Sequence, residues 1–431
     1  MGREIEHFQV ALLLSCCLAT AATGIVSSSD AAAIADLTRS LARPPATWTA
    51  GGGDACSFKG VTCSPSGRVT AIDLAGQGLA GTLPSSLSSL TALESLQLQG
   101  NALSGAVPPL RAPSLTRLSL EGNAFTSLPG DFLRATPALR SLSMDGLPLP
   151  PRPFPDAIFS CSALRTFSAS NASITGRFPA AAVVANLTSI RTLRLSHNNL
   201  TGVISASLGR MASLADIALS YNHLQGPVPA FGPTVAAEVV AGNGFCLDEP
   251  GPCDAQVSAL LQVAEGFGYP LNLSMSWTGN DACSGWLGVI CDASEVTILG
   301  LTNYNLSGTI SLAIANLTGL RKLDLAGNRL TGEIPDALAA LPNLSLVDVR
   351  NNRLTGKLPK FRASVDVSAE GNSPSLGSHH GSGQGSLDDG SSPSSDSAAV
   401  PHRRRNCSWH YCSWACFLDV ELACKIYCLS S

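Results

Sequence analysis

Charged and aromatic side chains are scarce in this chain of 431 residues. Asp, Glu, Lys and Arg make up 13% of the sequence, about half of the usual share, and Phe, Trp and Tyr make up 5%. The formal net charge of -4 excludes a globally basic nucleic-acid-binding protein, so we expect no nucleic-acid partner. Hydrophobic residues still make up 45%, which excludes an intrinsically disordered chain. The length suits roughly two to four domains.

Catalytic motifs are also missing. The sequence contains no P-loop, no glycine-rich kinase loop and none of the V-A-I-K, H-R-D or D-F-G motifs. Its seven histidines form no Ser/His/Asp arrangement. His197 directly precedes the turn residue Asn198 and His223 directly follows the turn residue Asn222, and we interpret both histidines as solvated surface residues. We therefore predict no catalytic residue, no metal site and no cofactor.

No apolar run reaches the ~20 residues that a membrane-spanning helix needs. The run Val10–Ala22 is too short to span, and it ends in the small-x-small pattern that signal peptidase prefers. We predict a secretory signal peptide over residues 1–22, and the alternative is an N-terminal helix of the core. Secretion would place the mature chain in the extracellular space, the apoplast, without a membrane span.

The cysteines suit an oxidising compartment. Of the 14, two leave with the signal peptide, five crowd the C-terminal tail, and Cys161 stands alone in mid-chain. The other six form close pairs that lack the C-x-x-C spacing and the His partners of a zinc site. These pairs are Cys56 with Cys63, Cys246 with Cys253, and Cys283 with Cys291. We predict three local disulfides, with Cys161 outside them.

Asn-x-Ser/Thr sequons, the acceptors of N-glycans in secreted proteins, are frequent. The sequons for which we predict glycosylation are Asn171, Asn186, Asn199, Asn272, Asn305, Asn316 and Asn343. Another, Asn406, lies in the C-terminal tail.

A repeated motif determines the fold. The pattern L-x-x-L-x-L-x-x-N-x-L-x-G-x-V-P runs from Leu93 to Pro108 and returns along the chain. Each unit predicts one short strand with inward leucines, and an Asn whose amide bonds the backbone of the adjacent coil. We identify leucine-rich repeats of the plant extracellular type. They predict an α/β leucine-rich-repeat solenoid, a plant-type horseshoe or superhelix with parallel β-strands on its concave face.

The repeats fall into two blocks separated by a disulfide-bearing island. We count about seven repeats from Val69 to Pro229 and about three from Val296 to Pro359. Repeats between Leu115 and Pro179 are worn, and the proline run from Pro148 to Pro155 is expected to interrupt the solenoid and widen its spacing. The predicted parts are a signal peptide 1–22, an N-terminal cap 23–68, a first block 69–243, an island with a second cap 244–295, a second block 296–372, a Ser/Gly-rich disordered linker 373–401 and a Cys-rich tail 402–431.

The cap before each block follows one plan of a helix, a Trp, an Asp before the first Cys, and G-V-x-C. We interpret Asp54 and Asp281 as the turn residues of the two caps. The second cap reads W-T-G-N-D-x-C-x-x-W-x-G-V-x-C from Trp277 to Cys291. This motif between two repeat blocks resembles the extracellular half of plant transmembrane-kinase (TMK-type) receptor-like kinases, over about residues 30–372.

The resemblance implies a single-pass receptor with an intracellular Ser/Thr kinase that acts in auxin and growth signalling at the cell surface. After Asn372 the sequence departs from that pattern, because neither a membrane helix nor a kinase motif follows. We interpret the chain as truncated before these parts and its tail as non-homologous, with a cysteine knot or a palmitoylated anchor as alternatives. Kinase activity is therefore not carried over.

Exposed strand positions on successive repeats carry arginines. They are Arg117, Arg140, Arg165, Arg191 and Arg194. The repeat register places Arg140, Arg165 and Arg191 in one column, where guanidinium groups suit a carboxylate or sulfate ligand. The alternative is a solvated face whose counter-charges include Glu121 and Asp145.

These observations predict an extracellular ligand- or co-receptor-binding module that lacks its own kinase. Its partners would be an extracellular protein or peptide ligand, a co-receptor, or full-length receptor relatives. The alternative is a secreted leucine-rich-repeat inhibitor of cell-wall-degrading enzymes. Such inhibitors resemble one uninterrupted block with caps only at its ends, so the island favours the first interpretation.

Overall fold

The computed structural model describes residues 27–48, 54–130, 136–155, 158–159, 161–373 and 376. All of them belong to one compact unit, Met1–His379. The predicted signal peptide 1–22, nearly all of the linker, the tail 402–431 and Asn406 lie outside the described residues.

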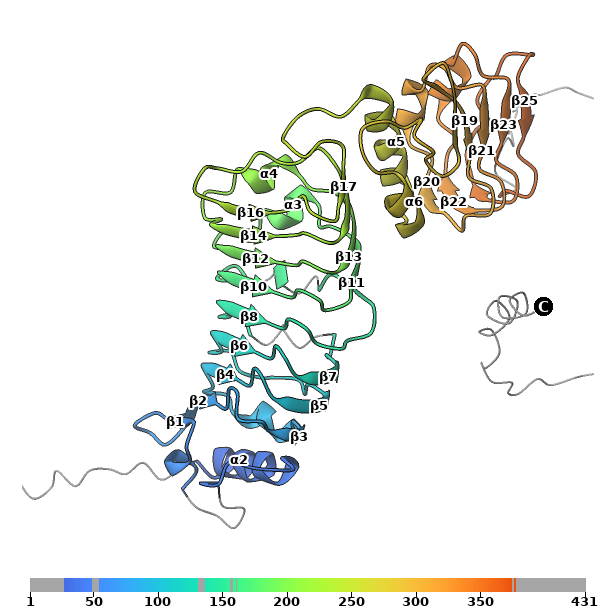
Figure 1. Cartoon of the computed structure of the whole chain (residues 1–431). Helices are drawn as coiled ribbons and strands as arrows, with labels where there is room; N and C mark the ends of the chain where they lie inside the picture. The colour runs from blue at the N-terminus through green and yellow to red at the C-terminus, as the bar shows by residue number, and fades with distance from the viewer. Residues whose placement is uncertain are drawn as a thin grey trace, which may run out of the picture. The chain divides into compact units, whose positions relative to one another are not determined.

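One long sheet, here called the front sheet, runs through the first block (Figure 1). Its strands in spatial order are β1 (Val61–Cys63), β2 (Val69–Asp73), β4 (Ser95–Gln97), β6 (Arg117–Ser119), β8 (Ser141–Ser143), β10 (Thr166–Ser168), β12 (Thr192–Arg194), β14 (Asp216–Ala218) and β16 (Ala236–Glu238). Strand β1 runs antiparallel to β2, and the later pairs are parallel. The repeats counted in the sequence correspond to β2 through β14, and β16 closes the block.

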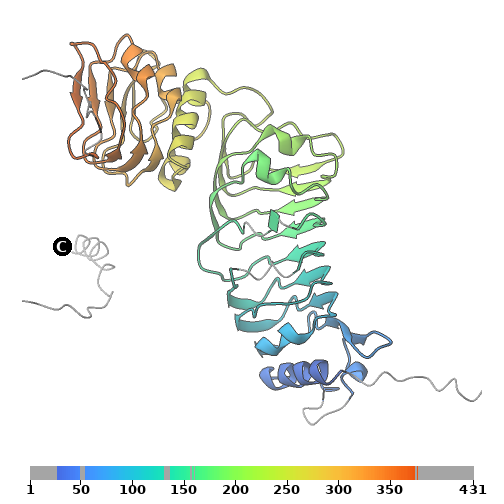
Figure 2. The same ribbon diagram turned by 180° about the vertical axis from the view of Figure 1, so that it is seen from behind.

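Further strands line the opposite side of the same repeats in two back sheets (Figure 2). The first back sheet contains β3 (Ala80–Thr82), β5 (Ala102–Ala106) and β7 (Ala124–Ser127). The second contains β9 (Arg152–Pro153), β11 (Ile174–Arg177), β13 (Asn199–Val203), β15 (His223–Gly226) and β17 (Gly244–Phe245). Helical turns complete some repeats, namely η2 (Ser85–Ser89), α3 (Ala181–Val184) and α4 (Ala206–Gly209).

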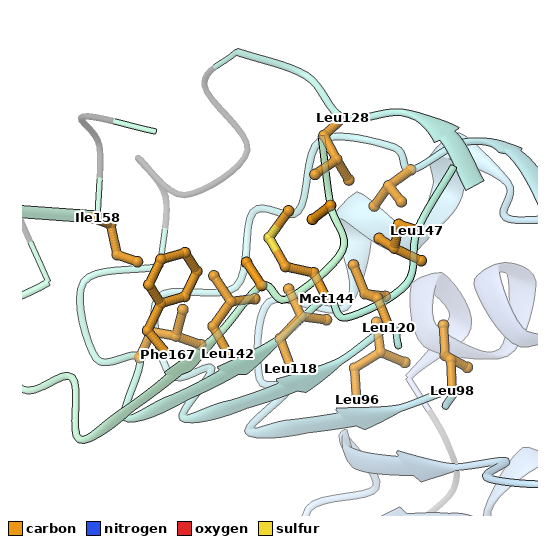
Figure 3. Close-up of a cluster of buried hydrophobic side chains, with 14 of the residues drawn as sticks. Leu96, Leu98, Leu118, Leu120, Leu128, Leu142, Met144, Leu147, Ile158 and Phe167 are labelled. Atoms are coloured by element: carbon orange, nitrogen blue, oxygen red, sulfur yellow. The ribbon is translucent and has the colours of Figure 1, made fainter. Parts of the chain in front are cut away.

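Leucines of the front sheet form the core between front and back. Leu96, Leu118, Leu142 and Phe167 occupy the same position in successive strands, and each is at most 1% exposed. Figure 3 shows these side chains on the same side of their strands, together with Leu98, Leu120 and Met144 from the turns that follow. A single repeat cannot bury this surface alone, so stacking of repeats is what stabilises the fold.

The Asn of each regular repeat bonds two neighbouring coils, as its position in the motif predicts. Asn198 Nδ2 donates to the carbonyl oxygens of Ala169 at 2.8 Å and Leu195 at 2.9 Å, and its Oδ1 accepts from Ile174 N at 2.9 Å. Asn222 repeats this pattern one coil later. The buried amide therefore satisfies backbone groups that no strand pairing reaches.

The proline run does not widen the front sheet, so this expectation was wrong. Strands β8 and β10 pair in register on either side of it, and Arg165 N donates to Arg140 O at 2.8 Å. The break lies instead between the two back sheets, after β7 and before β9. Two worn repeats keep buried apolar residues at the inward strand position, Leu142 and Phe167, but have Leu147 and Ala172 where the regular repeats carry Asn.

The second block repeats the two-sided arrangement. Its front sheet contains β18 (Val289–Asp292), β19 (Glu295–Gly300), β21 (Lys322–Asp324), β23 (Leu346–Asp348) and β25 (Asp366–Ser368). Its back sheet contains β20 (Ser307–Thr309), β22 (Arg329–Gly332) and β24 (Arg353–Leu354), with the helical turns η4 (Leu312–Asn316) and η5 (Asp336–Ala340). Strand β18 is again an antiparallel first strand.

Each block begins with a helical cap. The first cap holds α2 (Ser28–Ser40) and η1 (Ala55–Ser57), and the second holds α5 (Ala255–Gly266) and α6 (Leu271–Ser276). Asp54 and Asp281 accept from the backbone N–H groups of Cys56 and Cys283, which confirms both as turn residues. The two caps therefore share local geometry as well as sequence.

Equivalent contacts brace each cap internally and pack it against its block. Trp48 Nε1 donates to Lys59 O at 3.0 Å, and Trp277 Nε1 donates to Leu287 O at 2.9 Å. The last residues of α2 and α5 lie against Gly81 and Gly308, where any side chain would collide with a helix carbonyl oxygen. Glycine is required at both positions because the chains approach so closely and φ is positive.

Candidate ligand-binding surface

Three of the five predicted arginines form a contiguous column on the front sheet. Arg191 N donates to Arg165 O at 2.8 Å, and Arg165 N donates to Arg140 O at 2.8 Å. Neighbouring residues of this column are thus one strand spacing apart, about 4.8 Å. All three side chains are exposed. We call Arg140, Arg165 and Arg191 the arginine column.

Arg117 and Arg194 lie outside this column. Arg117 is in register with Ser141, one residue further along the strand. Arg194 lies near the other end of its strand and is paired with Asp216 of β14, with Nε 2.8 Å from Oδ2. The structure therefore brings together three of the five predicted residues and gives Arg194 an acidic partner within the chain.

Neither proposed counter-charge forms an ion pair with the arginine column among the described residues. Asp145 follows strand β8 and accepts hydrogen bonds from Ser168 Oγ and Ser170 N of the next repeat. Glu121 holds the equivalent position after β6, and its Oε2 is buried. Among the described residues, no ion pair involves Arg117, Arg140, Arg165 or Arg191. The column is an exposed group of like charges without an acidic partner in the described part of the chain.

A second feature lies just beyond the C-terminal ends of strands β12 and β14 of the same sheet, and we did not predict it from the sequence. The ring of His197 stacks on that of Tyr221 with centroids 4.4 Å apart and planes 12° apart. A cavity of about 460 Å³ adjoins this pair and is also lined by Ser196, Ser220 and Glu238. The sequence did contain a signal for this pair. The residue directly before the Asn position is Gly in the early repeats, whereas later repeats carry Asn171, His197 and Tyr221 there.

Another cavity, of about 520 Å³, lies between the back of the first block and helix α5. Arg177 of β11 pairs with Glu265 of α5, and its guanidinium group lies 5.3 Å from the centre of the Tyr269 ring. Burial, together with the Glu265 charge, raises the pKa of Tyr269 far above its ordinary value, so this phenol stays protonated. The polar groups here already bond one another, and the cavity wall is largely apolar.

Burial also shifts the pKa of two groups that do not line these cavities. His223 is half-buried, and burial lowers its pKa, so the interpretation of this residue as solvated was wrong. Burial raises the pKa of the Cys161 thiol, whose Sγ lies 4.0 Å from Thr136 O. In the described ranges, no three His, Cys, Asp or Glu residues are grouped to hold a metal ion. Within the same residues no helix is both long and apolar enough to cross a bilayer.

The structure contains disulfides at the three pairs expected from the sequence. They are Cys56–Cys63, Cys246–Cys253 and Cys283–Cys291, with Cα atoms 5.6, 5.5 and 5.7 Å apart. Each lies in a cap or in the island. The predicted glycosylation sites are all exposed residues: Asn171, Asn186, Asn199, Asn272, Asn305, Asn316 and Asn343.

Comparison with protein families places the chain among leucine-rich-repeat proteins. The Leucine rich repeat N-terminal domain matches residues 27–64 and again 253–292, and the Leucine Rich Repeat matches residues 189–211 and 319–341. The two N-terminal matches coincide with the two structural caps. The chain is thus a leucine-rich-repeat solenoid in which a second cap precedes the second block.

Its homologues within that class are plant receptor kinases. The chain is 46% identical to Receptor protein kinase WSS1 of Oryza sativa subsp. japonica, over 86% of the chain and 49% of that protein. It is 35% identical to Receptor-like kinase TMK4 and 32% identical to Receptor-like kinase TMK2, both of Arabidopsis thaliana. These alignments cover 85% and 72% of the chain, and 46% and 44% of the relatives. The chain therefore has the architecture of a leucine-rich-repeat receptor-like kinase ectodomain and spans about half the length of these relatives.

Proposed function

We propose that the chain is an extracellular recognition module of plant cell-surface signalling, which binds a protein or peptide ligand or a co-receptor. Its relatives are receptor kinases, and it matches about half of their length. The disulfides and the exposed sequons suit the secretory pathway and the apoplast. The module acts by engaging a ligand, a co-receptor or full-length receptor relatives.

The arginine column is the observation that carries this proposal. Three exposed guanidinium groups at one strand spacing repel one another, and nothing in the described fold offsets that repulsion. An acidic ligand group placed over the column would accept charge-assisted, bidentate hydrogen bonds from two neighbouring arginines. Binding would then relieve the repulsion that the free protein tolerates.

The caps and blocks suggest a division of labour. We propose a cap 23–68, a ligand-binding first block 69–243, an island 244–295 and a second block 296–372. The second cap, with two disulfides in the island region, separates this layout from the alternative function as an inhibitor of wall-degrading enzymes, which would need only one uninterrupted block.

A peptide array tests the role of the column. The secreted chain is screened against extended peptides, each made with a central Asp or sulfotyrosine and again with the neutral Asn or Tyr. We expect binders that require the acidic group. Charge reversal in Arg165→Glu/Arg191→Glu should weaken them at least about tenfold, because two charge-assisted bonds are lost.

The matched control is Arg117→Glu, which reverses an equally exposed arginine on the same sheet outside the column. It should leave binding by the same peptides within about twofold, and both variants should melt like the parent because surface charges contribute little to stability. Equal binding by the double variant and the parent, or no preference for acidic peptides, would show that the column is only a solvated face.

A further inference from the structure

The residue directly before the Asn position of each repeat, just after the front strand, is of an unusual type in part of the first block. In each repeat of the first block it adopts a left-handed conformation with φ between 51° and 69°. Glycine fills it in the early repeats and at the closing turn, as Gly76, Gly100, Gly122, Gly146 and Gly242. Asn171, His197 and Tyr221 fill it in the three repeats between. Asn and His are among the non-glycine residues that adopt this conformation most often, whereas Tyr adopts it only against a larger steric penalty, so its presence calls for a compensating contact.

Side chains at this position lean towards the next repeat. A Cβ added to Gly242 would collide with the ring of Tyr221 from the repeat before it. In the second block the equivalent glycines, Gly327 and Gly371, would collide in the same way with Asn303 and Asn351. His197 obeys this rule by stacking on Tyr221.

The same geometry directs Asn171 towards His197. Asn171 precedes His197 by one coil, and its N–H donates to Ser196 O at 2.9 Å, as the N–H of His197 does to Ser220 O at 3.0 Å. One ring face of Tyr221 is covered by His197, and the backbone of Gly242 lies against the same ring. The open face of the stack is therefore the side of His197 that faces Asn171.

We propose that Asn171 carries an N-linked glycan whose first N-acetylglucosamine packs on the open face of His197. The sequon Asn171-Ala172-Ser173 is intact, and Asn171 is exposed. In the transfer, Nδ2 bonds to C1 of the sugar of a lipid-linked oligosaccharide, the C1–O bond breaks, the polyprenyl diphosphate leaves with the bonding electrons, and Nδ2 gives up one proton. The pyranose C–H face and the imidazole face are then both removed from water.

This proposal rests on the proposed passage of the chain through the secretory pathway. It also bears on the binding surface. Asn171 lies six residues beyond Arg165 on its repeat, which is up to about 20 Å of extended chain. A glycan held against His197 and Tyr221 would therefore cover the far edge of the front sheet and leave the arginine column open.

Glycopeptide mass spectrometry and thermal unfolding of the chain secreted from plant cells test the proposal. We expect Asn171 to be occupied. His197→Ala should lower the melting temperature both in the glycosylated chain and in an Asn171→Asp variant that carries no glycan there. In this double-mutant cycle the loss should be about 1–3 °C larger in the glycosylated chain. Asp keeps the left-handed backbone but accepts no glycan.

Endoglycosidase release provides a second measurement that does not depend on stability. The endoglycosidase should release the glycan of the folded protein more slowly at Asn171 than at Asn316, an exposed sequon at the end of η4. His197→Ala should accelerate this release at Asn171 alone. An unmodified Asn171 beside occupied sequons, or an effect of His197→Ala that is the same with and without the glycan, overturns this inference and leaves the secretory proposal standing. A chain with no occupied sequon overturns both.

Discussion

The front sheet and the back sheets of the first block respond differently to the same worn repeats. Strands β8 and β10 continue the front sheet in register through them. The back side breaks there into two separate sheets. Front pairing needs only inward apolar side chains and an extended backbone, and the worn strands keep both, with Leu142 and Phe167 at the inward position. On the back side the break lies at the repeat in which Leu147 replaces the Asn, whereas β11, which follows Ala172, still pairs with β9 and β13.

The front side of the solenoid thus follows the hydrophobic pattern throughout, whereas the back side is interrupted at one repeat that lacks the side-chain amide. In the worn repeat that carries Leu147, Asp145 provides a different link between coils, because its carboxylate accepts from Ser168 and Ser170 of the next coil. A carboxylate cannot donate, so the carbonyl oxygens that an Asn would reach must find other partners. The difference between the two sides can be tested by removing, in turn, a core side chain, the amide of a repeat Asn and the carboxylate of Asp145.

The largest expected effect comes from the front core. Phe167→Ala in the worn strand β10 and Leu193→Ala in the regular strand β12 should each destabilise by about 3–5 kcal/mol, because both side chains are buried in one continuous core. Urea unfolding measures the two losses. A cost below about 1 kcal/mol for Phe167→Ala would mean that the worn strand is not a full member of the sheet.

Removing one ladder amide should have an intermediate effect. Asn198→Ala leaves several buried backbone groups without their partner, and we expect a loss of about 2–4 kcal/mol in the free energy of unfolding. The exposed amide Gln77 is the control, and Gln77→Ala should cost less than about 0.5 kcal/mol. Equal costs for the two variants would refute the role assigned to the amide ladder.

The smallest effect is expected for Asp145, whose carboxylate links its worn repeat to the next coil. Asp145→Ala removes the acceptor of Ser168 and Ser170, which should cost about 1–2 kcal/mol by thermal or urea unfolding. Asp145→Asn keeps an acceptor at the same place and should lose less. If Asp145→Ala destabilises as much as Asn198→Ala, the worn and regular repeats are bonded equally well and the comparison collapses.

Much of the fold could be predicted from the sequence because the repeat places the same residue type in the same environment many times. The strand leucines, the bonding of Asn198 and the turn roles of Asp54 and Asp281 all follow from local chemistry. The proline run misled because prolines mark a turn without saying which side of a repeat they disturb. Here they disturb the back and leave the front paired.

The candidate surface was harder to predict. Register alone placed Arg140, Arg165 and Arg191 in one column, because strand pairing is fixed by the leucine pattern. The partner of Arg194 and the bonding of Asp145 depend on side-chain reach across neighbouring repeats, which spacing does not reveal. The stack of His197 on Tyr221 requires left-handed backbone at two non-glycine residues, against their usual preference.

The duplicated cap has a consequence for how such chains can change over evolutionary time. Because each coil contacts only its neighbours and each block starts from its own cap, whole coils can be gained or lost inside a block without redesigning either terminus. The number of coils sets how many exposed columns a ligand meets. Gene-level insertion or deletion of one repeat unit would therefore rescale the recognised surface in steps, while the disulfide-bonded caps stay the same.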